Sequence, residues 1–162
     1  MPRSLLMVVS FVSLAATAAA QGGPKLSVGY AYLHNYDQGL GNVPVGAFVS
    51  LAGGSATTLE VDAGYHRDSE DGFTLETFTL TAGPRFGFGQ PGNSAPFMHI
   101  LGGVRRDKFA DFSNTSYGGM AGLGIDIRTS SRISLRLGAD FQLFFEDGDN
   151  LKSLRLGVGL TF

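Results

Sequence analysis

The three histidines, His34, His66 and His99, are the residues of this sequence best suited to bind a transition metal or to transfer protons. A zinc-binding pair on a helix needs the spacing His-Glu-x-x-His, which places both imidazoles on one face. The three histidines are too far apart in the sequence to form this motif. We therefore expect neither a metal nor another cofactor, and a hydrogen-bonded structural role for any histidine inside the fold.

Two acidic segments carry the oxygen ligands that calcium prefers: Asp68-Ser69-Glu70-Asp71-Gly72 and Glu146-Asp147-Gly148-Asp149-Asn150. Neither follows the EF-hand spacing, in which a glutamate closes the loop at a fixed distance. We expect both segments to be solvated turns, with divalent cation binding as the alternative.

The remaining candidates are arginines and carboxylates that alternate with apolar residues. Between residues 132 and 145 the odd positions are apolar, whereas the even positions include Arg136, Asp140 and Gln142. The last ten residues alternate in the same way, with apolar side chains at Leu154, Leu156, Val158, Leu160 and Phe162. Strict alternation predicts β-strands with one apolar and one polar face.

Alternating segments occur eight times, and no long helical periodicity separates them. They span about residues 26–36, 43–52, 57–66, 73–88, 95–105, 117–128, 132–145 and 152–162. Most of them have about the ten residues that a tilted strand needs to cross a bilayer. Short turns are expected at 53–56, 91–94 and 129–131, and longer polar connections at 37–42, 67–72, 106–116 and 146–151. Short turns at one end and longer loops at the other are typical of an outer-membrane barrel.

The first twenty residues predict export. Met1, Pro2 and Arg3 form a short positive end, an apolar run from Leu5 to Ala16 follows, and residues 18–20 are alanines. This pattern is typical of a secretory signal peptide over residues 1–20, cleaved before Gln21. Residues 21–162 then form one domain, which without cysteine has no disulfides. The 12 basic and 14 acidic residues form no basic patch, so nucleic acid is not an expected partner.

The composition of the polar face distinguishes a soluble sandwich from a membrane barrel. A water-facing sheet commonly carries lysine, but Lys25, Lys108 and Lys152 are the only lysines, and they lie at predicted strand ends or in loops. The polar face instead carries glycine, serine, arginine and carboxylates. Buried charges need partners, so we predict an ion-pair network in a filled lumen, formed by Glu60, Asp62, Arg85, Arg105, Asp126, Arg136, Asp140 and Arg155.

The leader, the eight segments and the terminal strand Leu154-x-Leu156-x-Val158-x-Leu160-x-Phe162 together resemble the small outer-membrane β-barrel proteins of the OmpA transmembrane-domain and OmpX type. The segments Pro96–Gly103, Gly122–Arg128 and Ile133–Leu137 are similar to middle and late strands of that family. The resemblance implies an all-β, eight-stranded antiparallel up-and-down transmembrane barrel. It also implies that the terminal strand is the signal read by the barrel assembly machinery, after delivery by periplasmic chaperones.

Three function classes remain for such a barrel. The first, which we favour, is a structural or surface-interaction role of a monomer in the outer membrane of a diderm bacterium, with both termini in the periplasm. The second is a narrow channel for small solutes, which a charged and filled interior disfavours. The third is a lipid A modifying enzyme. A deacylase-like His-x-Ser pattern is absent, because the residue two positions after each histidine is Tyr36, Asp68 or Leu101, so we expect no enzymatic activity.

Overall fold

The computed structural model describes residues 24–36, 42–43, 45–53, 57–70, 73–88, 92–109, 112–146 and 149–162. The predicted signal peptide lies outside these residues. Nine strands are formed: β1 (Lys25–Asn35), β2 (Asn42–Val43), β3 (Val45–Ala52), β4 (Thr57–Glu70), β5 (Phe73–Gly87), β6 (Ser94–Phe109), β7 (Phe112–Arg128), β8 (Ser134–Glu146) and β9 (Asp149–Thr161). Among the described residues, no helix is long and apolar enough to cross a membrane.

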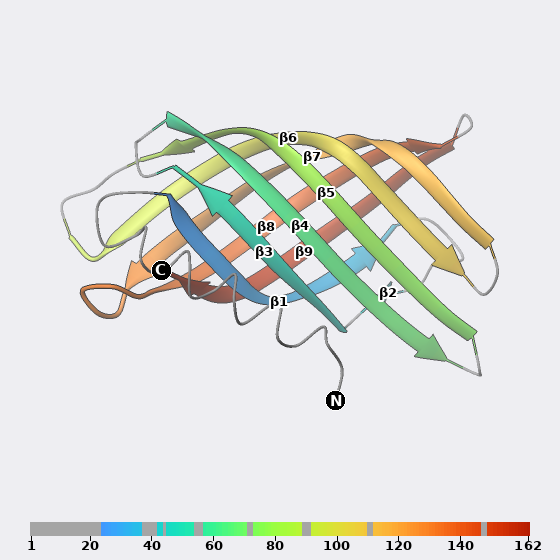
Figure 1. The fold of residues 1–162 in the computed structure, drawn as a ribbon, viewed down its shortest axis with the longest axis horizontal. Helices are drawn as coiled ribbons and strands as arrows, with labels where there is room; N and C mark the ends of the chain where they lie inside the picture. The colour runs from blue at the N-terminus through green and yellow to red at the C-terminus, as the bar shows by residue number, and fades with distance from the viewer. Residues whose placement is uncertain are drawn as a thin grey trace.

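The strands form one closed antiparallel sheet (Figure 1). From β3 to β9 each strand pairs with the next one in the sequence, and β1 closes the ring by pairing with β9 from Ser27↔Thr161 to Asn35↔Ser153. β2 and β3 both pair with β1, with the register shifted by one residue between Leu33↔Val43 and Tyr30↔Ala47. They are two pieces of one barrel strand, so the predicted eight-stranded up-and-down barrel is confirmed.

The two faces of the sheet have opposite chemistry. Side chains alternate between the faces of a strand, and the enclosed face of β4 carries Glu60 and Asp62, which are 1% and 2% exposed. The outward face carries large apolar residues, among them Leu59 at 65% and Leu123 at 66% exposure. A soluble sandwich would enclose the apolar faces instead. The distribution therefore excludes the sandwich and leaves a barrel with an apolar exterior and a charged lumen.

The polar connections are shorter than predicted at one end of the barrel. β4 continues to Glu70. β6 continues to Phe109 and β7 begins at Phe112, while β8 continues to Glu146 and β9 begins at Asp149. The predicted loops 67–72, 106–116 and 146–151 are therefore mostly strand. The alternation of apolar and polar residues ends where the outward face becomes polar. The backbone hydrogen bonds between neighbouring strands need no apolar side chains, so the strands continue beyond that point.

The same correction applies to the acidic segments. Asp68, Ser69 and Glu70 lie in β4, and Glu146, Asp149 and Asn150 lie in β8 and β9, rather than in solvated turns. The rest of these segments, residues 71–72 and 147–148, lies outside the described residues. We call this end of the barrel the loop end. The opposite end, where β3–β4, β5–β6 and β7–β8 connect, is called the turn end.

Candidate functional site: the lumen network

The register of the barrel places opposite charges side by side in the lumen. Asp126 of β7 lies directly across from Arg136 of β8, and Asp140 of β8 lies across from Arg155 of β9. Directly opposed side chains on one face of an antiparallel pair are near enough to interact. The alternation that gives each strand a polar face therefore also brings these groups together.

One half of the network surrounds Asp126. Arg136 donates to both of its oxygens, from Nε to Oδ1 at 2.8 Å and from Nη2 to Oδ2 at 3.0 Å. Arg85 of β5 donates from Nη2 to Oδ2 at 2.9 Å. Both arginines also face Glu60 of β4, at 3.7 Å from Arg85 and 3.5 Å from Arg136. Two carboxylates and two guanidinium groups are thus paired inside the barrel, and a bidentate pair is among the strongest that proteins form.

The other half surrounds Arg155, which is 3% exposed. Its Nη1 lies 2.7 Å from Asp62 Oδ1, and its Nη2 lies 2.7 Å from Asp140 Oδ2. Its Nε also donates to Asp140 Oδ2, at 2.8 Å. One guanidinium therefore contacts two buried carboxylates, from β4 and β8.

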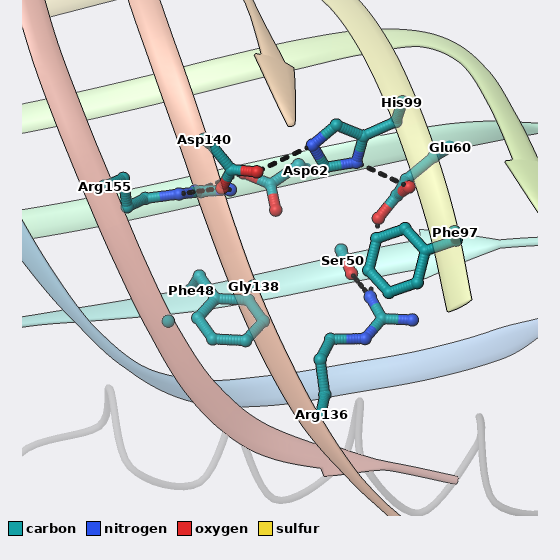
Figure 2. A pocket seen from close by; sticks show the side chains of 11 residues that line it. Phe48, Ser50, Glu60, Asp62, Phe97, His99, Arg136, Gly138, Asp140 and Arg155 are labelled. Carbon is teal, nitrogen blue, oxygen red and sulfur yellow. Dashed lines mark hydrogen bonds and ion pairs between the residues drawn. The ribbon is translucent and has the colours of Figure 1, made fainter. Parts of the chain in front are cut away.

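His99 of β6 joins the two halves. Its Nδ1 lies 3.0 Å from Glu60 Oε2, and its Nε2 lies 2.9 Å from Asp140 Oδ1 (Figure 2). Ionised carboxylates only accept hydrogen bonds, so an imidazolium that donates from both nitrogens satisfies both contacts. Four carboxylates are then balanced by three guanidinium groups and one imidazolium, and the formal charge of the network is zero.

Two phenylalanines fill the space beside the network. The guanidinium carbon of Arg85 lies 3.7 Å from the centre of the Phe97 ring, and that of Arg136 lies 4.7 Å from it. Phe48 lies 5.7 Å from the guanidinium carbon of Arg155. Such stacking stabilises a cation that has lost its water.

A small cavity remains among Phe48, Phe97, Gly138 and the charged groups (Figure 2). The space open to the centre of a water-sized sphere is about 20 Å³, which is room for about one water molecule. The cavity is therefore too small for a solute to occupy without rearrangement of the network.

Of the eight residues predicted to form the network, Arg105 is not part of it. It is fully buried but pairs with Asp107, from Nε to Oδ2 at 2.7 Å, and donates to Ser153 and Asn35. Arg105 lies six positions beyond His99 on β6, about 20 Å away at the rise of a strand. It forms a second polar cluster nearer the loop end, whereas the other seven residues meet in the central network.

The histidines behave differently from one another. A hydrogen-bonded structural role was expected of any histidine inside the fold. His99 has this role in the lumen, but the way it joins the two halves was missed. His66 is fully buried, yet neither ring nitrogen has a hydrogen-bond partner among the described residues. His34 lies near the loop end, where Nδ1 is hydrogen bonded to Asn42. Phe97, His99 and Arg105 are all at odd positions of β6, so they share one face of the strand. The predicted lumen position of Arg105 is therefore the signal that places Phe97 and His99 on the lumen face.

The terminal strand lies on the closing seam of the barrel. Leu156, Val158 and Leu160 are 42–45% exposed on the outward face, and Leu154 alternates with them on β9. Phe162 exchanges backbone hydrogen bonds with Leu26, at 2.8 and 3.3 Å. The residues of the predicted assembly signal are thus presented to the outside along the junction between β9 and β1.

The arrangement offers little acid–base or metal chemistry. Among the described residues, no group of three His, Cys, Asp or Glu side chains is arranged to hold a metal ion. Both ring nitrogens of His99 contact carboxylates, so neither is available to accept a proton from a nucleophile. The geometry is that of a neutral plug held together by ion pairs.

Two lumen glycines provide a matched test of this packing. A Cβ at Gly122 would lie 2.0 Å from Asp140 Oδ1 and 2.7 Å from His99 Nε2, whereas a Cβ at Gly138 would meet only the Leu123 carbonyl oxygen, at 3.8 Å. We expect Gly122→Ala to lower the free energy of unfolding by about 1–3 kcal/mol. Gly138→Ala should leave it unchanged or slightly higher. Urea unfolding in lipid vesicles measures both, and equal effects would contradict the geometry.

Known proteins with the same barrel architecture are similar to this chain. The family model described as "Outer membrane protein beta-barrel domain" matches residues 4–162. Neisserial surface protein A (NspA) is similar over 85% of this chain and 94% of its own, with a TM-score of 0.68 and 14% identity. Ail, the attachment invasion locus protein of Yersinia pestis, is similar over 86% of this chain and 99% of its own, with a TM-score of 0.57 and 17% identity.

An enzyme has the same fold. The outer membrane enzyme PagL is similar over 82% of this chain and 97% of its own, with a TM-score of 0.52 and 14% identity. At these identities the similarities establish the fold alone. No curated protein matches the chain at a significant level.

Proposed function

This chain belongs to the outer membrane protein β-barrel domain family, and we propose that it is a non-conducting outer-membrane barrel with a structural or surface-interaction role. The observation that carries the proposal is the filled lumen. Seven charged side chains and His99 form a continuous network across the barrel, and the space left beside them is about 20 Å³. Breaking these pairs to admit a solute would leave buried charges without partners, which costs several kcal/mol for each ion.

Conductance across a planar bilayer tests the closed lumen. We expect the purified barrel to give no stepwise current at neutral pH, because the ion pairs of β4–β9 fill its cross-section. A double variant, Phe97→Ala with Arg136→Ala, removes a ring and a guanidinium beside the cavity and should produce small steps. The variant Phe141→Ala, which alters only the outward face, serves as the control. Reproducible steps from the unaltered protein would contradict the proposal and favour the narrow channel.

The proposed location and partners rest on the family and on the sequence. The signal peptide over residues 1–20 would deliver the chain to the periplasm, and the exposed seam of β9 would present the assembly signal to the barrel assembly machinery. The turn end would then face the periplasm and the loop end the exterior. NspA and Ail are named as a surface protein and an attachment invasion protein, which makes cell-surface contact the first interaction to test.

A deletion strain separates the remaining classes. Under our proposal, loss of the gene alters detergent sensitivity or adherence but leaves the acylation of lipid A unchanged. Complementation with a variant in which Asn-Gly replaces residues 108–113 of the β6–β7 extension, which keeps the Arg105–Asp107 pair, distinguishes the two roles. This variant should restore detergent resistance but not adherence if the loop end makes the contact. A change in lipid A acylation that the intact gene reverses would favour an enzyme instead.

A further inference from the structure

The charged side chains at the loop end are divided between the two faces of the sheet. Alternation places three exposed cations on the outward face: Arg67 of β4, and Arg106 and Lys108 of β6. The carboxylates next to them in the sequence, Asp68 and Asp107, lie on the lumen face and are partly buried. The three outward cations, which we call the outer basic patch, are therefore separated from these carboxylates by the sheet itself.

Two of the cations lie in one row across three strands. Arg67 is opposite Glu76 of β5, and Glu76 is opposite Lys108, so the two cations are about 10 Å apart, which is two strand spacings. Glu76 accepts a hydrogen bond from the Tyr65 hydroxyl at 2.8 Å, and among the described residues no ion pair involves Arg67 or Lys108. With Arg106 included, three cations accompany one carboxylate, and the patch keeps an excess of positive charge.

The adjoining row connects the patch with the apolar exterior. Tyr65, Phe78 and Arg106 are directly opposite one another on β4, β5 and β6, and the two aromatic residues are 42% and 44% exposed. Arg106 Nη2 donates to Ser113 Oγ at 3.2 Å, and Ser113 is paired with Lys108 in the row beyond. The guanidinium of Arg106 therefore extends away from the apolar band and toward the other two cations, while its stem lies beside the rings.

The position of the patch along the strands matches the boundary of the membrane. On the outward faces of β4–β7, no described residue between the row of Tyr65 and Phe78 and the turn end is charged. Aromatic residues gather at the two boundaries of the apolar band in membrane barrels, and these two rings mark the boundary at the loop end. Arg67 and Lys108 lie two residues farther along their strands, about 7 Å beyond the rings, where lipid headgroups begin.

We propose that the outer basic patch binds the phosphates of lipid headgroups in the leaflet at the loop end. The chemistry fits because guanidinium groups pair with phosphate in a bidentate manner and lysine adds a point charge. Basic residues at a membrane surface also attract anionic lipids. In the orientation proposed above, this leaflet is the outer one. The inference rests on the proposed function only in requiring that the barrel lies in a bilayer.

The sequence contains no tryptophan, so one introduced tryptophan reports on its own surroundings. Phe78→Trp places it beside the patch, and Leu135→Trp places it on the outward face at the turn end. Bilayers contain equal amounts of phosphatidylglycerol and phosphatidylcholine with bromine on one or the other, so quenching measures the local ratio of the two lipids. For Phe78→Trp we expect about a threefold preference for phosphatidylglycerol at low salt, lost in about 0.5 M salt. For Leu135→Trp we expect no preference.

Three sets of variants in the Phe78→Trp protein make the result specific to the patch. The first set neutralises the patch and should abolish the preference: Arg67→Gln, Arg106→Gln and Lys108→Gln. The control set removes the same number of exposed cations at the turn end and should preserve it: Lys25→Gln, Arg128→Gln and Arg132→Gln. Glu76→Gln should raise the preference, because glutamine can still accept the Tyr65 hydrogen bond but no longer repels phosphate.

A preference near one in the Phe78→Trp protein, or one that survives the first set, would overturn the inference. Neutralisation of the patch by Asp71 or Asp111, which lie outside the described residues, would give the first of these results. Binding of soluble heparin that needs the patch, without any lipid preference, would also overturn the inference and would assign the patch to a ligand outside the membrane. Failure to fold in any bilayer would instead contradict the proposed function itself.

Discussion

Arg155→Met is expected to lower the free energy of unfolding of the barrel by about 3–5 kcal/mol, because it leaves buried charges without a partner. Arg155 is the cation that contacts Asp62, at 2.7 Å, and its Nη2 lies 2.7 Å from Asp140. Methionine retains much of the side-chain volume, so the loss reports on charge rather than on a cavity. Urea unfolding in lipid vesicles, followed by fluorescence of an introduced tryptophan, measures the difference.

Two further variants make this result specific to the network. Lys152→Met removes an exposed cation from the same strand and should change stability by less than about 1 kcal/mol. Adding Asp62→Asn to Arg155→Met should recover part of the loss, because one unpaired carboxylate is then removed. An effect of Arg155→Met as small as that of Lys152→Met would show that the lumen admits enough water to solvate its charges.

Leu156→Arg is expected to destabilise the barrel in the bilayer by about 2–4 kcal/mol. Leu156 is 45% exposed and lies on the outward face of β9, between Tyr32 of β1 and Ala139 of β8. Near the middle of the bilayer, an arginine there must be solvated by lipid defects or extend to the surface. Unfolding in vesicles, with Leu156→Phe as the apolar control, measures the effect. If Leu156→Arg is as stable as the parent, the outward face of β9 does not meet lipid.

The faces of the strands were predictable because alternation has a period of two and needs no tertiary information. That rule places Glu60, Asp62, Arg136 and Asp140 in the lumen and Leu156 outside. Strand number and closure also followed from the eight segments. The identity of the ion-pair partners did not follow, because the register between strands is set by the closed sheet rather than by either strand alone.

Position along the barrel axis was the other information missing from the sequence. Arg105 lies at a position of β6 that faces the lumen. It is too far along the strand to reach the central carboxylates, so it pairs with Asp107. His99 occupies the level at which Glu60 and Asp140 face each other, and only the assembled barrel brings them within reach. The last residues of β6 and the first residues of β7 were missed for a related reason. Paired strands that continue beyond the apolar band do not alternate between apolar and polar residues, so the pattern does not reveal them.

Gel mobility of the outer-membrane fraction, compared before and after boiling, tests the central claim most directly. The protein would be expressed with its own signal peptide and compared with the periplasmic fraction of the same cells. A closed barrel with an apolar exterior predicts a mature band in the outer-membrane fraction whose mobility changes on boiling. A soluble periplasmic band with unchanged mobility would contradict the barrel and would mean that the apolar faces pack against each other instead.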